Sequence, residues 1–88
     1  MSEIQHKEGE FFITSGSEKS KLTYTLSEGV MNASHTFVPE SMRGRGIAKK
    51  LVLELVSYAK ANNYQIDPVC SYVQKFFEEN KEYKDLVV

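Results

Sequence analysis

Three stretches in the first half of the chain carry the hydrophobic pattern of β-strands. Residues 10–14 hold a short apolar run, residues 21–26 alternate apolar and polar side chains, and residues 30–38 are long enough for a third strand. Alternation with a period of two is typical of a strand that buries one face. Turn-forming segments at 15–17 and 27–29 separate the three, so we expect antiparallel neighbours joined by short turns.

The second half of the chain predicts two helices around one more strand. Residues 47–60 place apolar side chains on one helical stripe, and the pair Asn62-Asn63 ends the helix. Residues 64–69 can form a fourth strand, interrupted at Pro68, which suggests an edge strand or one that bends away from its neighbour. Ser71 is the expected N-cap of a last helix that runs to about Asn80. The apolar stripe predicted for that helix is Tyr72, Val73, Phe76 and Phe77.

The order strand, strand, strand, helix, strand, helix predicts an α/β fold with a mixed sheet. The fourth strand follows a crossover helix, so it should run parallel to the third. The loop between the third strand and the first helix then lies at the carboxyl end of a strand. Ligands commonly bind at that position in open α/β sheets.

That loop, Arg43-Gly44-Arg45-Gly46-Ile47-Ala48, has the composition of an anion-binding turn. Gly44 and Gly46 lack a Cβ, so the backbone can approach a ligand closely. The first N–H groups of the following helix have no internal partner, and the helix dipole adds partial positive charge there. Arg43 and Arg45 can supply planar donors to phosphate oxygens. The alternative to an anion site is a solvent-exposed turn whose arginines bind no ligand.

Composition narrows the classes of function. The 88 residues suit one domain, 1–88, whose polar residues 1–9 we expect to be partly disordered and not to form a secretory signal. A net charge of −1 argues against a nucleic-acid or membrane partner, so phosphate affinity must come from local basic residues. The single cysteine permits no internal disulfide and suits a cytoplasmic protein. The local basic cluster comprises Arg43, Arg45, Lys49 and Lys50.

These residues resemble the GNAT superfamily of N-acetyltransferases. Its acetyl-CoA signature, Arg/Gln-x-x-Gly-x-Gly/Ala between a strand and a helix, is matched by Arg43, Gly46 and Ala48. The chain is more narrowly similar to a small single-domain GNAT subfamily with three ordered segments. Its matches are His35, Thr36, Val38 and Pro39, then the Arg/Gly loop, then Pro68, Cys70 and Tyr72. The resemblance extends over roughly residues 10 to 87, including the ending 82–86.

The resemblance implies a truncated GNAT fold, in which the third strand and its parallel partner splay apart around the pantetheine arm of acetyl-CoA. Backbone groups near Phe37 and Val38 would pair with that arm, and the N–H groups of 43–48 would hold the pyrophosphate. The cofactor-binding set is therefore Phe37, Val38, Arg43, Gly44, Arg45, Gly46, Ile47 and Ala48, with no metal. The chain departs from typical members in lacking the N-terminal helices that help form the acceptor site. Phe37 also stands where many members carry a glutamate.

Three residues are candidates for catalysis, each with a structural alternative. His35 lies on the strand before the loop and could accept the amine proton, or it could simply hydrogen-bond within the strand. Cys70 adjoins a predicted helix N-terminus and could be a nucleophile, or it could be a small packing residue beside the CoA thiol. Tyr72 could protonate the departing thiolate, or it could pack as an aromatic side chain.

Two functions remain open at this point. The first is an acetyl-CoA-dependent acyltransferase that passes the acetyl group directly to an amine, on a small molecule or a protein. The second is a CoA or acyl-CoA binding module without efficient turnover. A nucleic-acid contact through Arg43 and Arg45 is a weaker reading, since the near-neutral charge argues against it. We expect a monomer or weak dimer.

Overall fold

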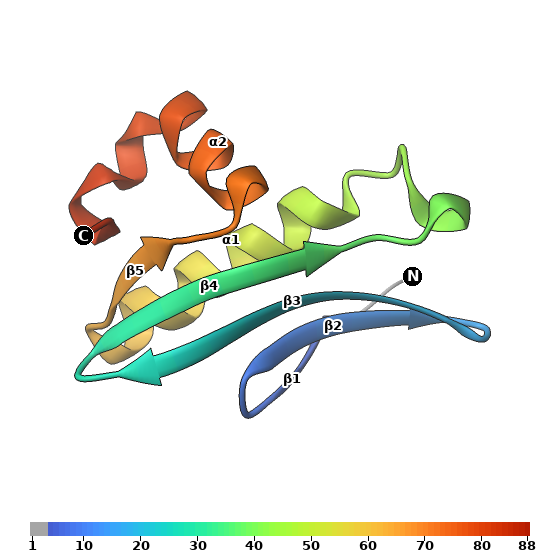
Figure 1. Ribbon diagram of the computed structural model, residues 1–88, viewed down its shortest axis with the longest axis horizontal. Coiled ribbons are helices and arrows are strands. Elements are labelled where there is room, and N and C mark those ends of the chain that lie inside the picture. Colours follow the sequence, from blue (N-terminus) through green and yellow to red (C-terminus); the bar gives the residue numbers. More distant parts are fainter. Residues whose placement is uncertain (1–3) are drawn as a thin grey trace.

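The computed structural model describes residues 4–88, which fold into a five-stranded mixed sheet with helices packed on one face (Figure 1). The strands lie in chain order: β1 (Gln5–Lys7), β2 (Glu10–Ser15), β3 (Glu18–Ser27), β4 (Val30–Phe37) and β5 (Gln65–Pro68). The first four are antiparallel neighbours, and β5 runs parallel to β4. The predicted α/β class with a mixed sheet is therefore confirmed.

Two long helices and two short 3₁₀ helices complete the described chain. They are η1 (Glu40–Met42), α1 (Ile47–Asn62), α2 (Ser71–Glu79) and η2 (Lys81–Leu86). As predicted, α1 ends at the asparagine pair: Asn63 adopts the left-handed conformation at φ 58°, and its N–H bonds to Ala59 and Lys60 carbonyls. Within residues 4–88, neither helix is both long and apolar enough to span a bilayer.

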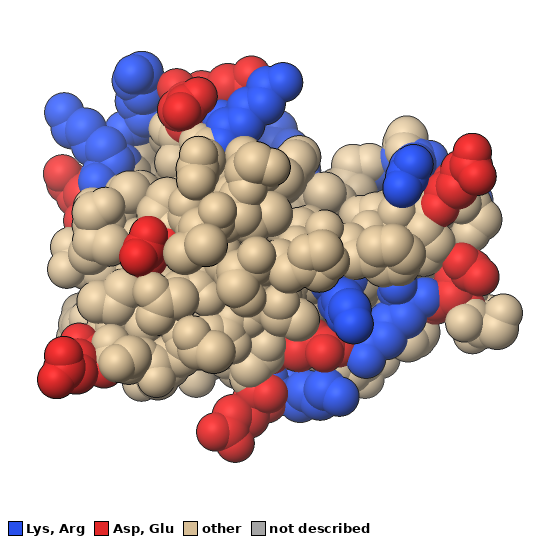
Figure 2. All heavy atoms as spheres, in the orientation of Figure 1, with Lys and Arg blue, Asp and Glu red and all other residues tan. Residues whose placement is uncertain are grey.

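Alternation along the strands puts the core on one face of the sheet. Phe11, Ile13, Leu22 and Met31 are at most 1% exposed and pack against α1, which crosses behind the sheet in Figure 1. The opposite face carries mostly polar, exposed or half-buried side chains. Figure 2 shows this face as largely uncharged along β4, with charged side chains over β2 and the start of β3. One broad face of the sheet is therefore open.

A β-bulge interrupts this alternation in β4. The β3–β4 register shifts between Thr23 and Tyr24, so that Thr23 pairs with His35 while Tyr24 pairs with Ala33. The extra residue, Ser34, moves the side chains beyond it by one position. Thr36 consequently lies opposite the buried Leu22 and faces the helix side, whereas His35 faces the open side. Strict alternation from Met31 and Ala33 would place His35 on the helix side and Thr36 on the open side.

Three local predictions were wrong. Residues 5–7 are not disordered but form β1, which pairs His6 with Phe11; residues 1–3 lie outside the described part of the chain. The N-cap of α2 is Cys70 rather than Ser71, because Cys70 is the last extended residue, at φ −69° and ψ 134°. Tyr72 does not join the buried stripe of α2, since it is 39% exposed.

Candidate functional site

The parallel strands β4 and β5 separate after four paired positions. Their register ends at Ala33 opposite Pro68, and the Cys70 N–H then donates to the Ala33 carbonyl at 2.9 Å. Beyond that bond the chain turns into α2, while β4 continues to Phe37 with only β3 beside it among the described strands. The two strands diverge as a wedge beyond this point, and Pro68, which has no N–H to donate, lies where the ladder stops.

Cys70 and Thr36 face each other across this wedge. The half-buried Cys70 thiol donates to Thr36 Oγ1 with a separation of 3.6 Å. Burial raises the pKa of the Cys70 thiol, but the Thr36 hydroxyl and the nearby N–H groups of Val73 and Tyr72 outweigh it, so the pKa lies below the usual value. The wedge therefore contains a thiol with enhanced thiolate character, held at the start of a helix.

The loop between η1 and α1 forms the second part of the site. Gly44 and Gly46 have φ of 81° and 70°, and an added Cβ would meet no atom within 4 Å at either position. Gly46 is the N-cap of α1 and its carbonyl accepts the first helical bond from Lys50 N–H, while no side chain caps the helix. The earlier N–H groups of α1 are thus left for an external acceptor beside open space.

The charge at the start of α1 also suits an anion. The first turn holds no acidic residue, and Lys49 and Lys50 lie there, both exposed. Cations near a helix N-terminus oppose the helix dipole and are ordinarily unfavourable. A bound phosphate group would reverse that balance, because it interacts favourably with the dipole and with the lysines.

A cleft of about 220 Å³ lies against this loop. Arg43 helps to shape it, since its Nε donates to the Val38 carbonyl at 3.0 Å and thereby ties the loop to the end of β4. Arg45 is exposed and is not among the lining residues. The cleft is lined by Val38, Met42, Arg43, Gly44, Gly46, Ile47, Ala48, Lys49 and Tyr72.

The predicted site residues therefore fall into three groups. The loop residues from Arg43 to Ala48, with Val38 and Tyr72, gather around one cleft, apart from the outlying Arg45. Cys70 lies in the wedge. His35 and Phe37 are exposed, and Phe37 is 44% accessible, so neither lies in the loop cleft.

Tyr72 connects the loop cleft to a neighbouring hollow of about 290 Å³ between α1 and α2. Burial, followed by the nearby Glu79 carboxylate, raises the pKa of Tyr72 above its ordinary value. Its phenol is therefore protonated at neutral pH and can donate a hydrogen bond.

No function could be assigned to Thr36 from the sequence, in which it is only one of the matches in the segment from His35 to Pro39. The signal that would have identified it is the bulge, which turns Thr36 toward Cys70. Bulges of this kind leave no mark in hydrophobic periodicity, because residues 34–36 are all polar.

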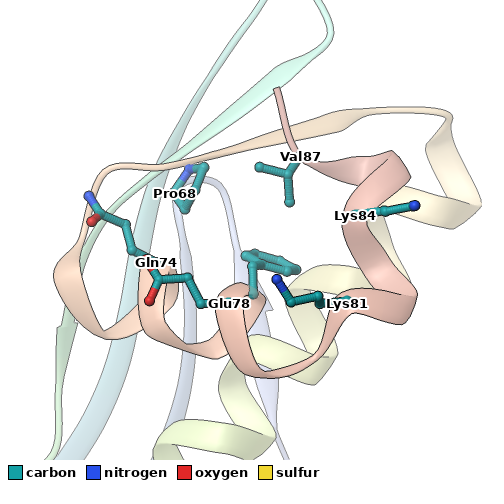
Figure 3. Close-up of a pocket in the computed structure, with 7 residues that line it drawn as sticks. Pro68, Gln74, Glu78, Lys81, Lys84 and Val87 are labelled. Atoms are coloured by element: carbon teal, nitrogen blue, oxygen red, sulfur yellow. The ribbon is translucent and has the colours of Figure 1, made fainter.

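A separate cleft of about 420 Å³ lies beyond α2, between that helix, the end of β5 and η2 (Figure 3). Figure 3 shows Gln74 and Glu78 on one side and Lys81 across from them. It shares no lining residue with the loop cleft, so it is not part of the site built around Gly46. No group of three or more metal-binding side chains occurs in the described chain.

Comparisons with known proteins agree with this architecture. Residues 10–86 match the profile of a family described as GCN5-related N-acetyl-transferase. The solution structure of a GCN5-like protein from Staphylococcus aureus superposes with a TM-score of 0.81 at 29% identity, covering 98% of this chain and 87% of that one. The chain belongs to the GCN5-related N-acetyltransferase family.

Two curated relatives match a smaller share of the chain. The chain is similar to Protein NATD1 of Bos taurus, at 37% identity over 55 residues, which are 62% of this chain and 49% of that protein. It is also similar to Protein NATD1 of Danio rerio, at 34% identity over 64 residues, 72% of this chain and 58% of that protein. The chain thus spans about half the length of the curated relatives it matches.

Proposed function

We propose that this protein binds acetyl-CoA and transfers its acetyl group directly to an amine. The observation that carries the proposal is the conjunction of an uncapped, lysine-bearing α1 N-terminus with a wedge between β4 and β5. A CoA molecule needs both, since one end is a pyrophosphate and the other a thin, amide-containing arm. The family membership supports this ligand.

In this proposal the loop N–H groups from Arg43 to Ala48 hold the pyrophosphate. Gly44 and Gly46 leave room for it, because an added Cβ would project into the open space. Lys49 contributes charge at the same cleft. Arg43 acts chiefly by holding the loop through Val38, and the exposed Arg45 reaches the ligand from outside the cleft.

The pantetheine arm then follows the unpaired side of β4 toward the wedge. Backbone groups near Phe37 and Val38 pair with its amides, as an added strand would. The arm directs the thioester toward Cys70 and Thr36, where the strands meet. Cys70 lines this position as a neighbour of the reacting carbonyl rather than as an acyl carrier.

The amine approaches from the open face of the sheet. His35 faces that side and accepts the proton that the amine loses as it attacks the thioester carbonyl. Tyr72, protonated because its pKa is raised, donates to the sulfur as the carbon–sulfur bond breaks. The face along β4 carries little charge (Figure 2), which suits a neutral acceptor amine.

A second candidate is a CoA or acyl-CoA binding module without efficient turnover. It is favoured by the placement of His35, which is exposed and, in the described structure, makes no side-chain hydrogen bond that would orient its ring. A base that is not oriented contributes little to proton transfer.

Acetyl-CoA consumption, measured with and without a panel of primary amines, separates the two. A transferase consumes acetyl-CoA in proportion to an amine, and His35→Ala slows it without weakening binding. A binding module retains the ligand intact with every amine. Intact-mass spectrometry on the same samples tests direct transfer, because a stoichiometric acetyl adduct on Cys70 would contradict it.

A further inference from the structure

A cleft larger than the loop cleft lies at the β1 edge of the sheet, away from the loop that we assign to CoA. Its volume is about 640 Å³, and it shares no lining residue with the loop cleft. Nothing in the proposed acetyl transfer uses it. The residues that line it are His6, Glu8, Gly9, Tyr24, Thr25, Leu26 and Tyr58.

Three aromatic rings from three different elements meet in this cleft: His6 from β1, Tyr24 from β3 and Tyr58 from α1. The centroids of His6 and Tyr58 are 4.6 Å apart with planes at 67°, and those of His6 and Tyr24 are 5.9 Å apart at 31°. Rings at such different angles present π faces in more than one direction. At these separations the rings touch one another, so they form one continuous aromatic wall of the cleft.

The rings are held in place from behind. Phe11, which is 1% exposed, stacks on His6 with centroids 4.2 Å apart. His6 Nε2 and the Tyr24 hydroxyl are 2.6 Å apart and share a hydrogen bond. Burial raises the pKa of Tyr24, so its ring remains a neutral phenol. The aromatic walls are therefore pre-organised, which lowers the cost of binding a ligand.

The cleft contains an acidic side chain but no lysine or arginine. Glu8 is the only carboxylate among the lining residues, and it lies near enough to Tyr24 to contribute to that raised pKa. The adjacent Lys7 lies over the Phe12 ring, with its Nζ 5.8 Å from the centroid, and is not a lining residue. Leu26, which is 46% exposed, adds an apolar edge.

We propose that this cleft binds an alkylated ammonium group. The positive charge would be attracted to the aromatic wall and to the Glu8 carboxylate, while its methyl groups contact Leu26 and the ring carbons. A simple hydrophobic ligand gains nothing from the carboxylate, and an anion is repelled by it. The cleft is separate from the acetyl-CoA site, so the proposal stands whether or not transfer occurs.

Choline and its neutral carbon isostere, 3,3-dimethylbutan-1-ol, provide the test. They have nearly the same shape and differ in the charge. In NMR titrations of the full chain, choline is expected to shift the amide signals of β1 and of the residues around Tyr24 and Tyr58, and the isostere is expected to leave them nearly unchanged. Equal shifts from both compounds, or none from choline, would overturn the proposal.

Two variants test which groups of the cleft bind choline. Tyr58→Leu removes an aromatic face and Glu8→Gln removes the charge, and each is expected to weaken choline binding roughly five- to thirty-fold. Glu82→Gln, in η2, is the matched control and leaves the affinity unchanged. Should Tyr58→Leu fail to fold, the exposed Glu8 still permits the test. Wild-type affinity in Glu8→Gln would contradict the assigned role of the carboxylate and overturn the proposal.

The same chemistry can come from a free cation or from a methylated lysine of another protein. A short peptide carrying trimethyl-lysine distinguishes them. Tighter binding of the peptide than of choline indicates a protein-borne cation, whereas weaker binding indicates a small molecule.

Discussion

Alanine at Gly46 should weaken acetyl-CoA binding far more than it weakens the fold. Gly46 has φ 70° and Gly16, in the β2–β3 turn, has φ 61°; at both, an added Cβ would meet no atom within 4 Å. The two glycines are therefore a matched pair. They share the same backbone strain on substitution, and only Gly46 adjoins the loop cleft.

The magnitudes follow from that strain. A left-handed alanine costs about 1–2 kcal/mol, and its reduced freedom in the unfolded chain recovers about 0.4–1 kcal/mol. A net loss of about 1 kcal/mol lowers the Tm of a domain this size by roughly 4–8 °C, equally in Gly46→Ala and Gly16→Ala. Losing one N–H contact to a charged pyrophosphate costs about 1.5–3 kcal/mol more, or roughly a 10- to 150-fold weaker Kd, in Gly46→Ala alone.

Differential scanning calorimetry of the two unliganded variants and isothermal titration with acetyl-CoA measure these quantities. We expect the two variants to have similar Tm values and very different affinities for acetyl-CoA. If Gly46→Ala bound acetyl-CoA as tightly as Gly16→Ala did, the start of α1 would not be the pyrophosphate site.

Other substitutions test separate parts of the account. Through the α1 dipole, Lys49→Glu and Lys50→Glu should each stabilise the unliganded protein by about 0.3–1 kcal/mol. Only Lys49→Glu, which lies at the cleft, should strongly weaken acetyl-CoA binding, and equal affinities of the two variants in titration would refute this. Thr36→Val removes the hydroxyl that can donate to the Cys70 thiolate and so lower its pKa. The midpoint of thiol alkylation should therefore move to higher pH, and an unchanged midpoint would contradict that cause. Leu51→Ala, at a fully buried position, should cost about 2–5 kcal/mol in chemical denaturation, and a loss below about 1 kcal/mol would show that α1 does not anchor the core.

Much of the framework could be predicted from local patterns. The hairpin at Glu28-Gly29 is indicated by Gly29, which tolerates its φ of 80°, whereas Glu28 adopts φ 52°, a conformation that glutamate seldom takes. The start of α1 follows from glycine and arginine giving way to a helical apolar stripe, and its end from Asn63. The uncapped helix start at Gly46 could be predicted for the same reason, since helix starts have backbone donors whatever the sequence around them.

The remaining features depend on contacts between distant residues. Strand β1 has three exposed residues, so no periodicity marks it; it forms because His6 pairs beside Phe11 and packs on Tyr58. The bulge opposite Thr23 arises from pairing between β3 and β4, and only that pairing brings Thr36 to Cys70. The aromatic cleft at the β1 edge could not be predicted because the strand that completes it could not.

The most direct test of the central claim is an amide chemical-shift map of the protein with saturating acetyl-CoA. The account predicts that the largest changes fall on three segments: 34–38 along β4, 43–49 around the start of α1, and 70–73 at the start of α2. Changes confined to the cleft between α2 and η2, around Gln74 and Lys81, would place the ligand elsewhere and contradict the account, as would the absence of any change.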